Sequence, residues 1–237
     1  MICPVDILAF GAHPDDVELG AAGTLLKSRA EGKRFGLVDF TRGELGTRGS
    51  AELRDQEALN AAQILGAEFR YNCGFKDGRF VHDESHLQTL ITVLRKAKPE
   101  IVLANALQDR HPDHGRAAKM VIDACFYSGL SEWKDPEALP AFRPKLLLHY
   151  IQFNNLQPDI LIDISGQFKE KMASILAYSS QFYNPANSAP ETPISSQTFL
   201  ESLEGRAQDW GKIIGTSHAE GFNMSRPPGV QSPFQLI

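Results

Sequence analysis

The sequence predicts an α/β fold, in which a mostly parallel sheet carries helices on both faces. Along the first two-thirds of the 237 residues, short apolar runs of strand length alternate with longer helical patterns. Residues that end helices follow three of those patterns, at Gly32, Gly66 and Pro99. Hydrophobic residues make up 42% of the chain and charged residues 22%, so the chain can bury a sizeable core.

Strands and helices are expected in alternation before residue 130. The strands are expected at 6–12, 34–41, 68–75 and 100–105, and the helices at 17–32, 51–66, 83–98 and 114–129. A helix between two strands lets the second strand run parallel to the first. The arrangement is Rossmann-like, and we expect the functional site in the crevice beyond the carboxyl ends of the strands.

The chain is richer in loops from about residue 130 onward. No linker is long or biased enough to divide it, so residues 1–237 are predicted to form a single domain. A polar stretch at 184–197 is either a lid or a connector. The elements expected in this part are a Pro-containing loop at 131–144, strands at 145–153 and 159–165, a helix at 167–182 and a last helix at about 198–214.

The charge and hydropathy of the chain indicate a small-molecule partner. A formal net charge of −5 argues against nonspecific binding to nucleic acid or to an anionic membrane, because both need a basic surface. The longest apolar runs are far shorter than the ~20 residues that cross a bilayer. The N-terminus has no basic segment followed by an apolar one, so we expect a cytoplasmic protein.

The cysteines exclude two kinds of site. Cys3, Cys73 and Cys125 are widely spaced and form no CxxC pair, which predicts reduced thiols rather than a disulfide framework or a thiolate zinc site. Any metal site in this chain therefore needs His and carboxylate ligands.

Two short motifs provide such ligands. HPDD (13–16) follows the first expected strand, and RHPDH (110–114) follows the fourth. His13, Asp16 and one His of the second motif would supply three ligands and leave one position open, as in catalytic zinc sites, although Mn or Fe accept similar ligands. The alternative is a pair of solvated turns, since Pro and Asp favour turns whatever the function.

Arginines are frequent near these motifs. Arg42, Arg48, Arg54 and Arg110 could bind carboxylates or phosphates of a substrate in two-point contacts, or they could be solvated loop residues. The Gly-rich segment 41–50 has neither the GxxxxGK[ST] order nor the GxGxxG spacing, which makes a nucleotide loop a weak interpretation.

Three segments resemble the LmbE/PIG-L family of zinc-dependent N-acetylglucosaminide deacetylases. They are AFGAHPDDVELGAAGTLL (9–26), TRGELGTRG (41–49) and DRHPDHGRAA (109–118), and HAEGF (218–222) is similar to the final strand of that family. The resemblance extends over 6–222 and is greatest to the branch that deacetylates N-acetylglucosaminyl-malate in bacillithiol biosynthesis. This chain has His218 where the family commonly carries Tyr, a change that either alters substrate contacts or caps the sheet edge.

The resemblance implies a role for each motif residue. It implies one zinc ion per chain, with Fe²⁺ or Mn²⁺ as substitutes, held by His13, Asp16 and His114. Asp15 would be the general base, His111 would stabilise the oxyanion and Asp113 would orient and charge His111. The residues that hold the sugar or its acidic aglycone would be Arg54 and Arg110. The family resemblance also implies a homo-oligomer, expected here to be a hexamer.

These observations together predict zinc-dependent hydrolysis of the acetamide of an N-acetylglucosaminide, with release of acetate and a free amine. Two other functions stay open at this point. Clustered acids are also compatible with a two-metal phosphoester hydrolase, and the glycine-containing segments with a nucleotide-binding module that has no catalytic activity.

Overall fold

A seven-stranded sheet runs through the computed structural model of the chain, which describes residues 1–236. The strand order is β3-β2-β1-β4-β5-β7-β6. The first five strands are parallel, and β7 is antiparallel to both of its neighbours. The strands are β1 (Ile7–Gly11), β2 (Phe35–Asp39), β3 (Phe69–Asn72), β4 (Ile101–Ala104), β5 (Leu146–Tyr150), β6 (Ile160–Asp163) and β7 (Ala219–Met224). The predicted α/β fold class is confirmed.

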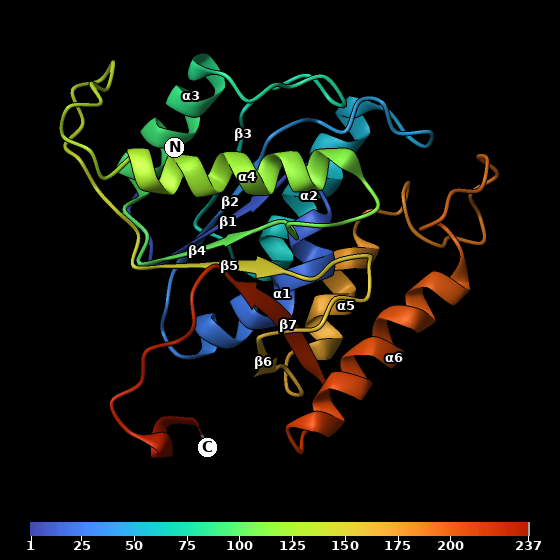
Figure 1. The fold of residues 1–237 in the computed structure, drawn as a ribbon. Helices are drawn as coiled ribbons and strands as arrows, with labels where there is room; N and C mark the ends of the chain where they lie inside the picture. The colour runs from blue at the N-terminus through green and yellow to red at the C-terminus, as the bar shows by residue number, and fades with distance from the viewer. Residues whose placement is uncertain (237) are drawn as a thin grey trace.

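Helices cover both faces of this sheet (Figure 1). On one face lie α3 (Glu84–Ala97) and α4 (Pro112–Tyr127), and on the other lie α1 (Asp16–Ala30), α2 (Ala51–Leu65), α5 (Phe168–Leu176) and α6 (Gln197–Ile213). A short 3-10 helix, η1 (Pro233–Leu236), follows the last strand. No helix among the described residues is long and apolar enough to span a bilayer.

The core is divided between the two faces by the strand alternation of β1. Leu8 and Phe10 pack into the cluster under α3 and α4, whereas Ile7 and Ala9 pack into the cluster with α1. All of these side chains are buried, as expected for a central strand whose neighbours cover it on both faces.

The chain changes direction across the sheet between β1 and β4. From β1 the strands proceed outward through β2 to β3, and from β4 they proceed the other way to β5. Because β1 and β4 are neighbours, the loops that follow them diverge and leave a crevice at their carboxyl ends. The two His- and Asp-containing motifs follow these two strands.

The structure differs from the sequence prediction at the end of α5. We expected this helix to continue to residue 182, but it ends at Leu176. Beyond it, the backbone N–H and the hydroxyl of Ser180 both donate to the buried Glu57 carboxylate, at 2.7 and 2.6 Å. We attribute the early end of the helix to these two hydrogen bonds, because a buried carboxylate without partners is costly.

Candidate functional site

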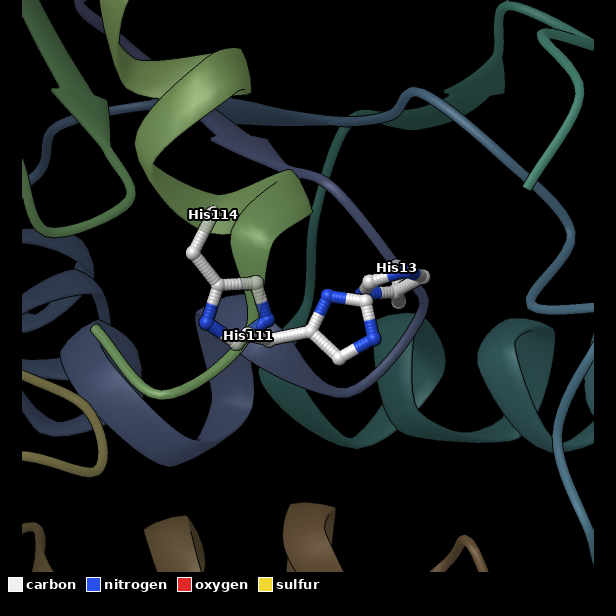
Figure 2. Close-up of side chains that lie close together, drawn as sticks. All are labelled: His13, His111 and His114. Carbon is white, nitrogen blue, oxygen red and sulfur yellow. The ribbon is translucent and has the colours of Figure 1, made fainter. Parts of the chain in front are cut away.

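Residues of both motifs line a cavity of about 370 Å³. His13 lies in the loop after β1, and His111 and His114 lie at the start of α4. Figure 2 shows the three imidazoles gathered at this point. Their ring centroids are between 4.7 and 5.5 Å apart. Pro112 begins α4 two residues earlier than expected, because the fixed φ of proline suits the first helical position.

Asp16 joins the two histidines that were predicted to bind a metal with it. Asp16 Oδ2 lies 3.6 Å from His13 Nδ1, and Asp16 Oδ1 lies 3.2 Å from His114 Nε2. Bonds of about 2.0–2.1 Å in a tetrahedral site place neighbouring donor atoms about 3.3–3.4 Å apart. The two Asp16–His distances are close to that spacing and run to different Asp16 oxygens, and the ligand atoms of His13, His111 and His114 lie within 4.8 Å of one another. This cluster can therefore hold a metal ion.

Two further carboxylates orient these histidines. Asp77 Oδ1 lies 3.0 Å from His13 Nε2, and Asp109 Oδ2 lies 3.0 Å from His114 Nδ1. Each carboxylate contacts the ring nitrogen that faces away from Asp16, so the nitrogen toward Asp16 is left free to bind a metal. The sequence interpretation assigned no role to Asp77, which is 64 residues from His13, or to Asp109, which directly precedes the RHPDH motif.

Asp16 is itself held by neutral donors. Asn105 Nδ2 donates to Oδ2 at 3.0 Å, and Gln152 Nε2 donates to Oδ1 at 2.5 Å. Asn105 follows β4 and Gln152 follows β5, so adjacent strands of the sheet fix this carboxylate. We had expected the fifth strand to reach residue 153, but it ends at Tyr150, which releases Gln152 to the site.

The charges of this cluster favour a bound cation. Although burial opposes ionisation, His114 and His13 hold the pKa of Asp16 well below its usual range. Burial likewise opposes the charged form of His114, but Asp16 and Asp109 raise its pKa to about 9. The cluster thus binds protons where it could bind a metal, and a metal would displace them.

Asp15 lies beside the cluster in an unusual conformation. Its φ of 104° is in the left-handed region, which few non-glycine residues adopt, and its side chain is buried. Burial raises the pKa of Asp15 to about 7, even though the neighbouring Arg54 lowers it. Arg54 Nη2 donates to Asp15 Oδ2 at 2.8 Å. A buried carboxyl with this pKa can exchange a proton near neutral pH.

Gly43 makes room for Arg54. A Cβ at Gly43 would lie 2.2 Å from Arg54 Nη1, and the φ of Gly43 is +66°. The absence of a side chain at Gly43, in the segment after β2, therefore lets the Arg54 guanidinium reach Asp15. Arg54 was predicted to hold substrate, and the structure places it in the cavity wall with its guanidinium already engaged by Asp15.

The carboxylate of Asp113 does not have the neighbours that were expected. It accepts from Gly78 N at 2.9 Å and from Arg116 Nη1 at 2.6 Å, and among the described residues no hydrogen bond joins it to His111. The backbone N–H of Asp113 instead donates to His111 Nδ1 at 3.2 Å. His111 Nε2 must then carry the proton of the neutral ring. Burial lowers the pKa of His111, which favours that neutral form.

Only some of the remaining predicted residues line the cavity. Arg110 lines the cavity and places its guanidinium 4.5 Å from the Phe153 ring centroid. Arg42 instead pairs with Asp55 on the surface, at 2.6 Å. His218 is not part of the cavity lining and stacks on Phe168, with ring centroids 4.1 Å apart. From the polar stretch 184–197, residues 191–194 line the cavity.

The fold and the cluster define an α/β protein with a His/Asp site that can hold a metal at the carboxyl ends of β1 and β4. Comparison with known proteins agrees with this class. The family described as "PIG-L: GlcNAc-PI de-N-acetylase" matches residues 8–125. The uncharacterized deacetylase YaiS of Escherichia coli is 34% identical over 130 residues, which cover 50% of this chain and 67% of that protein.

The chain belongs to the PIG-L family of deacetylases. It is accordingly a hydrolase of an amide bond, and the substrates of its family contain N-acetylglucosamine. A diacetylchitobiose deacetylase of Thermococcus kodakarensis is 26% identical over 235 residues, which cover 94% of this chain and 84% of that protein. The crystal structure of a conserved protein of Thermus thermophilus superposes with a TM-score of 0.83 at 34% identity and covers 97% of this chain and 98% of its own.

Proposed function

We propose that this chain is a zinc-dependent N-deacetylase that hydrolyses the acetamide of an N-acetylglucosaminide and releases acetate and the free amine. The observation that carries the proposal is the placement of Asp15. Its buried carboxyl group follows His13 by two residues and lines the same cavity as the His/Asp cluster, but it pairs with Arg54 rather than with the histidines.

His13, Asp16 and His114 would hold the zinc ion, with Asp77 and Asp109 orienting the two imidazoles. When bound there, zinc supplies a Lewis acid that polarises the acetamide carbonyl and lowers the pKa of a water toward ~7. The same donors would accept Fe²⁺ or Mn²⁺ as substitutes.

Asp15 acts as the general base on the attacking water. Its ionised carboxylate accepts the proton, and Arg54 keeps the carboxylate in place and favours the ionised form. The nucleophile then adds to the acetamide carbon, and negative charge develops on the acetamide oxygen.

His111 stabilises that developing charge. Because its Nδ1 accepts from the Asp113 backbone, its Nε2–H is the group available to donate to the oxyanion. Asp113 thus orients His111 through its amide, while its carboxylate contributes a nearby negative charge. The departing amine takes a proton from either Asp15 or His111 as the C–N bond breaks.

The identity of the aglycone and the oligomeric state of the protein remain predictions. An acidic aglycone such as malate would need a cation, and Arg110 is the predicted arginine that lines the cavity without pairing to Asp15. The hexamer is an expectation from the family resemblance.

The test is acetate release from N-acetylglucosaminyl-malate, N-acetylglucosamine and diacetylchitobiose, with the metal content measured on the same protein sample. We expect one zinc per chain and acetate from at least one substrate. Zinc-loaded protein that releases no acetate from any of them would refute the proposal. Two metals per chain with phosphoester cleavage would favour the phosphoesterase alternative, and binding of nucleotides in calorimetry without hydrolysis would favour the binding module.

A further inference from the structure

A turn in the segment after β2 faces the carboxylate of Asp77. The backbone N–H of Gly46 donates to the Gly43 carbonyl at 3.0 Å and closes this turn. Glu44 and Leu45 occupy its two central positions. Leu45 and Gly46 line the catalytic cavity, as does Asp77. The turn is therefore part of the cavity wall and also a neighbour of a carboxylate that orients a metal-binding histidine.

Two hydrogen bonds join the turn to Asp77 in opposite directions. The Glu44 carboxylate accepts from the Asp77 backbone N–H at 2.9 Å, through Oε1. The Asp77 carboxylate accepts from the Leu45 backbone N–H at 2.9 Å, through Oδ2. We call this reciprocal pair of bonds the Glu44–Asp77 clasp. Because it engages both the amide and one carboxylate oxygen of Asp77, it fixes the backbone and the side chain of that residue together.

The other carboxylate oxygen of Asp77 contacts His13. Asp77 Oδ1 lies 3.0 Å from His13 Nε2, and Asp77 is buried. The next residue, Gly78, donates its backbone N–H to Asp113 Oδ2 at 2.9 Å, in the second motif. The segment 77–78 is thus held between the clasp on one side and the start of α4 on the other. Both attachments keep the Asp77 carboxylate against the imidazole of His13.

Glu44 is exposed, yet its carboxylate bonds to backbone groups rather than to a charged side chain. Its Oε2 accepts from the Arg42 backbone N–H at 3.2 Å. Among residues 1–236 this carboxylate forms no ion pair, although the guanidinium of Arg42 pairs with both Glu52 and Asp55. Hydrogen bonds from N–H groups to an ionised acceptor are about twice as strong as those between neutral groups. An exposed side chain therefore acts directly on the buried Asp77.

We propose that Glu44 is a positioning residue that acts through Asp77 to hold the His13 imidazole in the orientation that a bound metal ion requires. Loss of a partner that orients a metal-binding histidine commonly costs about 10–100-fold in metal affinity. Glu44 lies one hydrogen bond further from the metal site, so the cavity wall itself contributes to retention of the metal. This inference rests on the metal site of the proposed function.

The test measures the dissociation constant of zinc by competition with a chromophoric chelator, and the Tm of the metal-free protein on the same samples. We expect Glu44→Ala to weaken zinc binding about tenfold, at the lower end of the range for orienting partners. The Tm of the metal-free protein should stay close to that of the wild type, because substitutions of exposed residues rarely change stability by more than about 0.5 kcal/mol. Equal zinc affinities for Glu44→Ala and the wild type would overturn the role of Glu44.

Two further variants separate the hydrogen bond from a general effect of charge. Glu52→Ala removes another exposed carboxylate near the turn, which pairs with Arg42, and its zinc affinity should equal that of the wild type. Glu44→Gln keeps one carbonyl oxygen for the Asp77 amide, so it should recover most of the affinity that Glu44→Ala loses. A Gln variant as weak as the Ala variant, or an equal loss in Glu52→Ala, would contradict the proposal.

A double-mutant cycle tests the route through Asp77. Asp77→Ala should weaken zinc binding by about 10–100-fold, and adding Glu44→Ala should then have no further effect, because the carboxylate through which Glu44 acts is gone. Additive losses would overturn this route. Zinc affinity is measured without a substrate, so an unchanged affinity in Glu44→Ala refutes only the role of Glu44. Wild-type protein that binds no zinc would instead refute the proposed function itself.

Discussion

The backbone of Asp15 adopts a conformation that costs free energy. A non-glycine residue at φ 104° is strained by roughly 1–3 kcal/mol, which the surrounding structure must offset. The ion pair between Asp15 and Arg54 and the hydrogen bond between Asp16 Oδ2 and the His13 amide, at 2.9 Å, hold this turn. This backbone conformation directs the two adjacent carboxylates to different partners. Asp16 faces His13 and His114, and Asp15 faces Arg54.

We predict that Asp15→Asn abolishes turnover but keeps the metal. The amide has the shape of the carboxylate and cannot accept a proton at neutral pH, so kcat should fall by about 10²–10⁴. Acetate release and elemental analysis of one sample would measure both effects. If zinc is lost together with activity, the roles of Asp15 and Asp16 have been exchanged.

Replacement of Arg54 by Gln should move the acid limb of the pH–rate profile to higher pH. The base works ionised, so kcat/KM falls when the pH drops through the pKa of Asp15. Burial raises that pKa and Arg54 lowers it, so removal of the guanidinium raises it further. A profile of kcat/KM between pH 5 and 9 would show the shift. A higher KM with an unmoved profile would mean that Arg54 only holds substrate.

At the scale of elements, the loop between β2 and α2 depends on the missing side chain of Gly43. Gly43→Ala would place a Cβ against the Arg54 guanidinium and require a left-handed alanine. We expect a loss of about 1–2 kcal/mol in the free energy of unfolding and a clear loss of activity, because Arg54 must leave Asp15.

Gly32→Ala is the control for this prediction. Gly32 has a φ of +82° and nothing within 4 Å of its Cβ position, so the substitution costs similar backbone strain without a clash. Denaturant unfolding should show comparable losses for the two variants, and acetate release should fall only for Gly43→Ala. Equal activities would show that Arg54 tolerates displacement.

At the scale of the whole molecule, the site concentrates buried negative charge. Asp15, Asp16 and Asp113 are all buried within the two motifs. We predict that removal of the metal with a chelator lowers the Tm, because the ion binds only the folded chain. Zinc at a hundred times its Kd stabilises by about 2.7 kcal/mol, or roughly 5–10 °C for a chain of this size. Thermal unfolding with chelator and with restored zinc would measure this, and identical Tm values would contradict it.

The sequence predicted the alternation of strands and helices well because its signals are local. Apolar periodicity and the helix-ending residues Gly66 and Pro99 act within a few residues. The juxtaposition of the two motifs was also predictable, since it follows from the strand ends of a parallel sheet. The orienting role of Asp77 was not predictable, because its contact with His13 joins loops 64 residues apart whose approach depends on tertiary packing. Asp109 is only five residues from His114, but its spacing alone does not show that it faces the His114 ring. The early end of α5 depends likewise on Glu57, a distant residue.

The place of β7 in the sheet bears on how the chain is synthesised. Among residues 1–236, this strand is the last of the seven in the sequence, yet it lies between β5 and β6 and is the only strand that pairs with β6. Until residues 219–224 have left the ribosome, β5 has an open edge and β6 has nothing to pair with. Unpaired edges invite association between chains. The nascent protein therefore completes this sheet only after residues 219–224 have been translated.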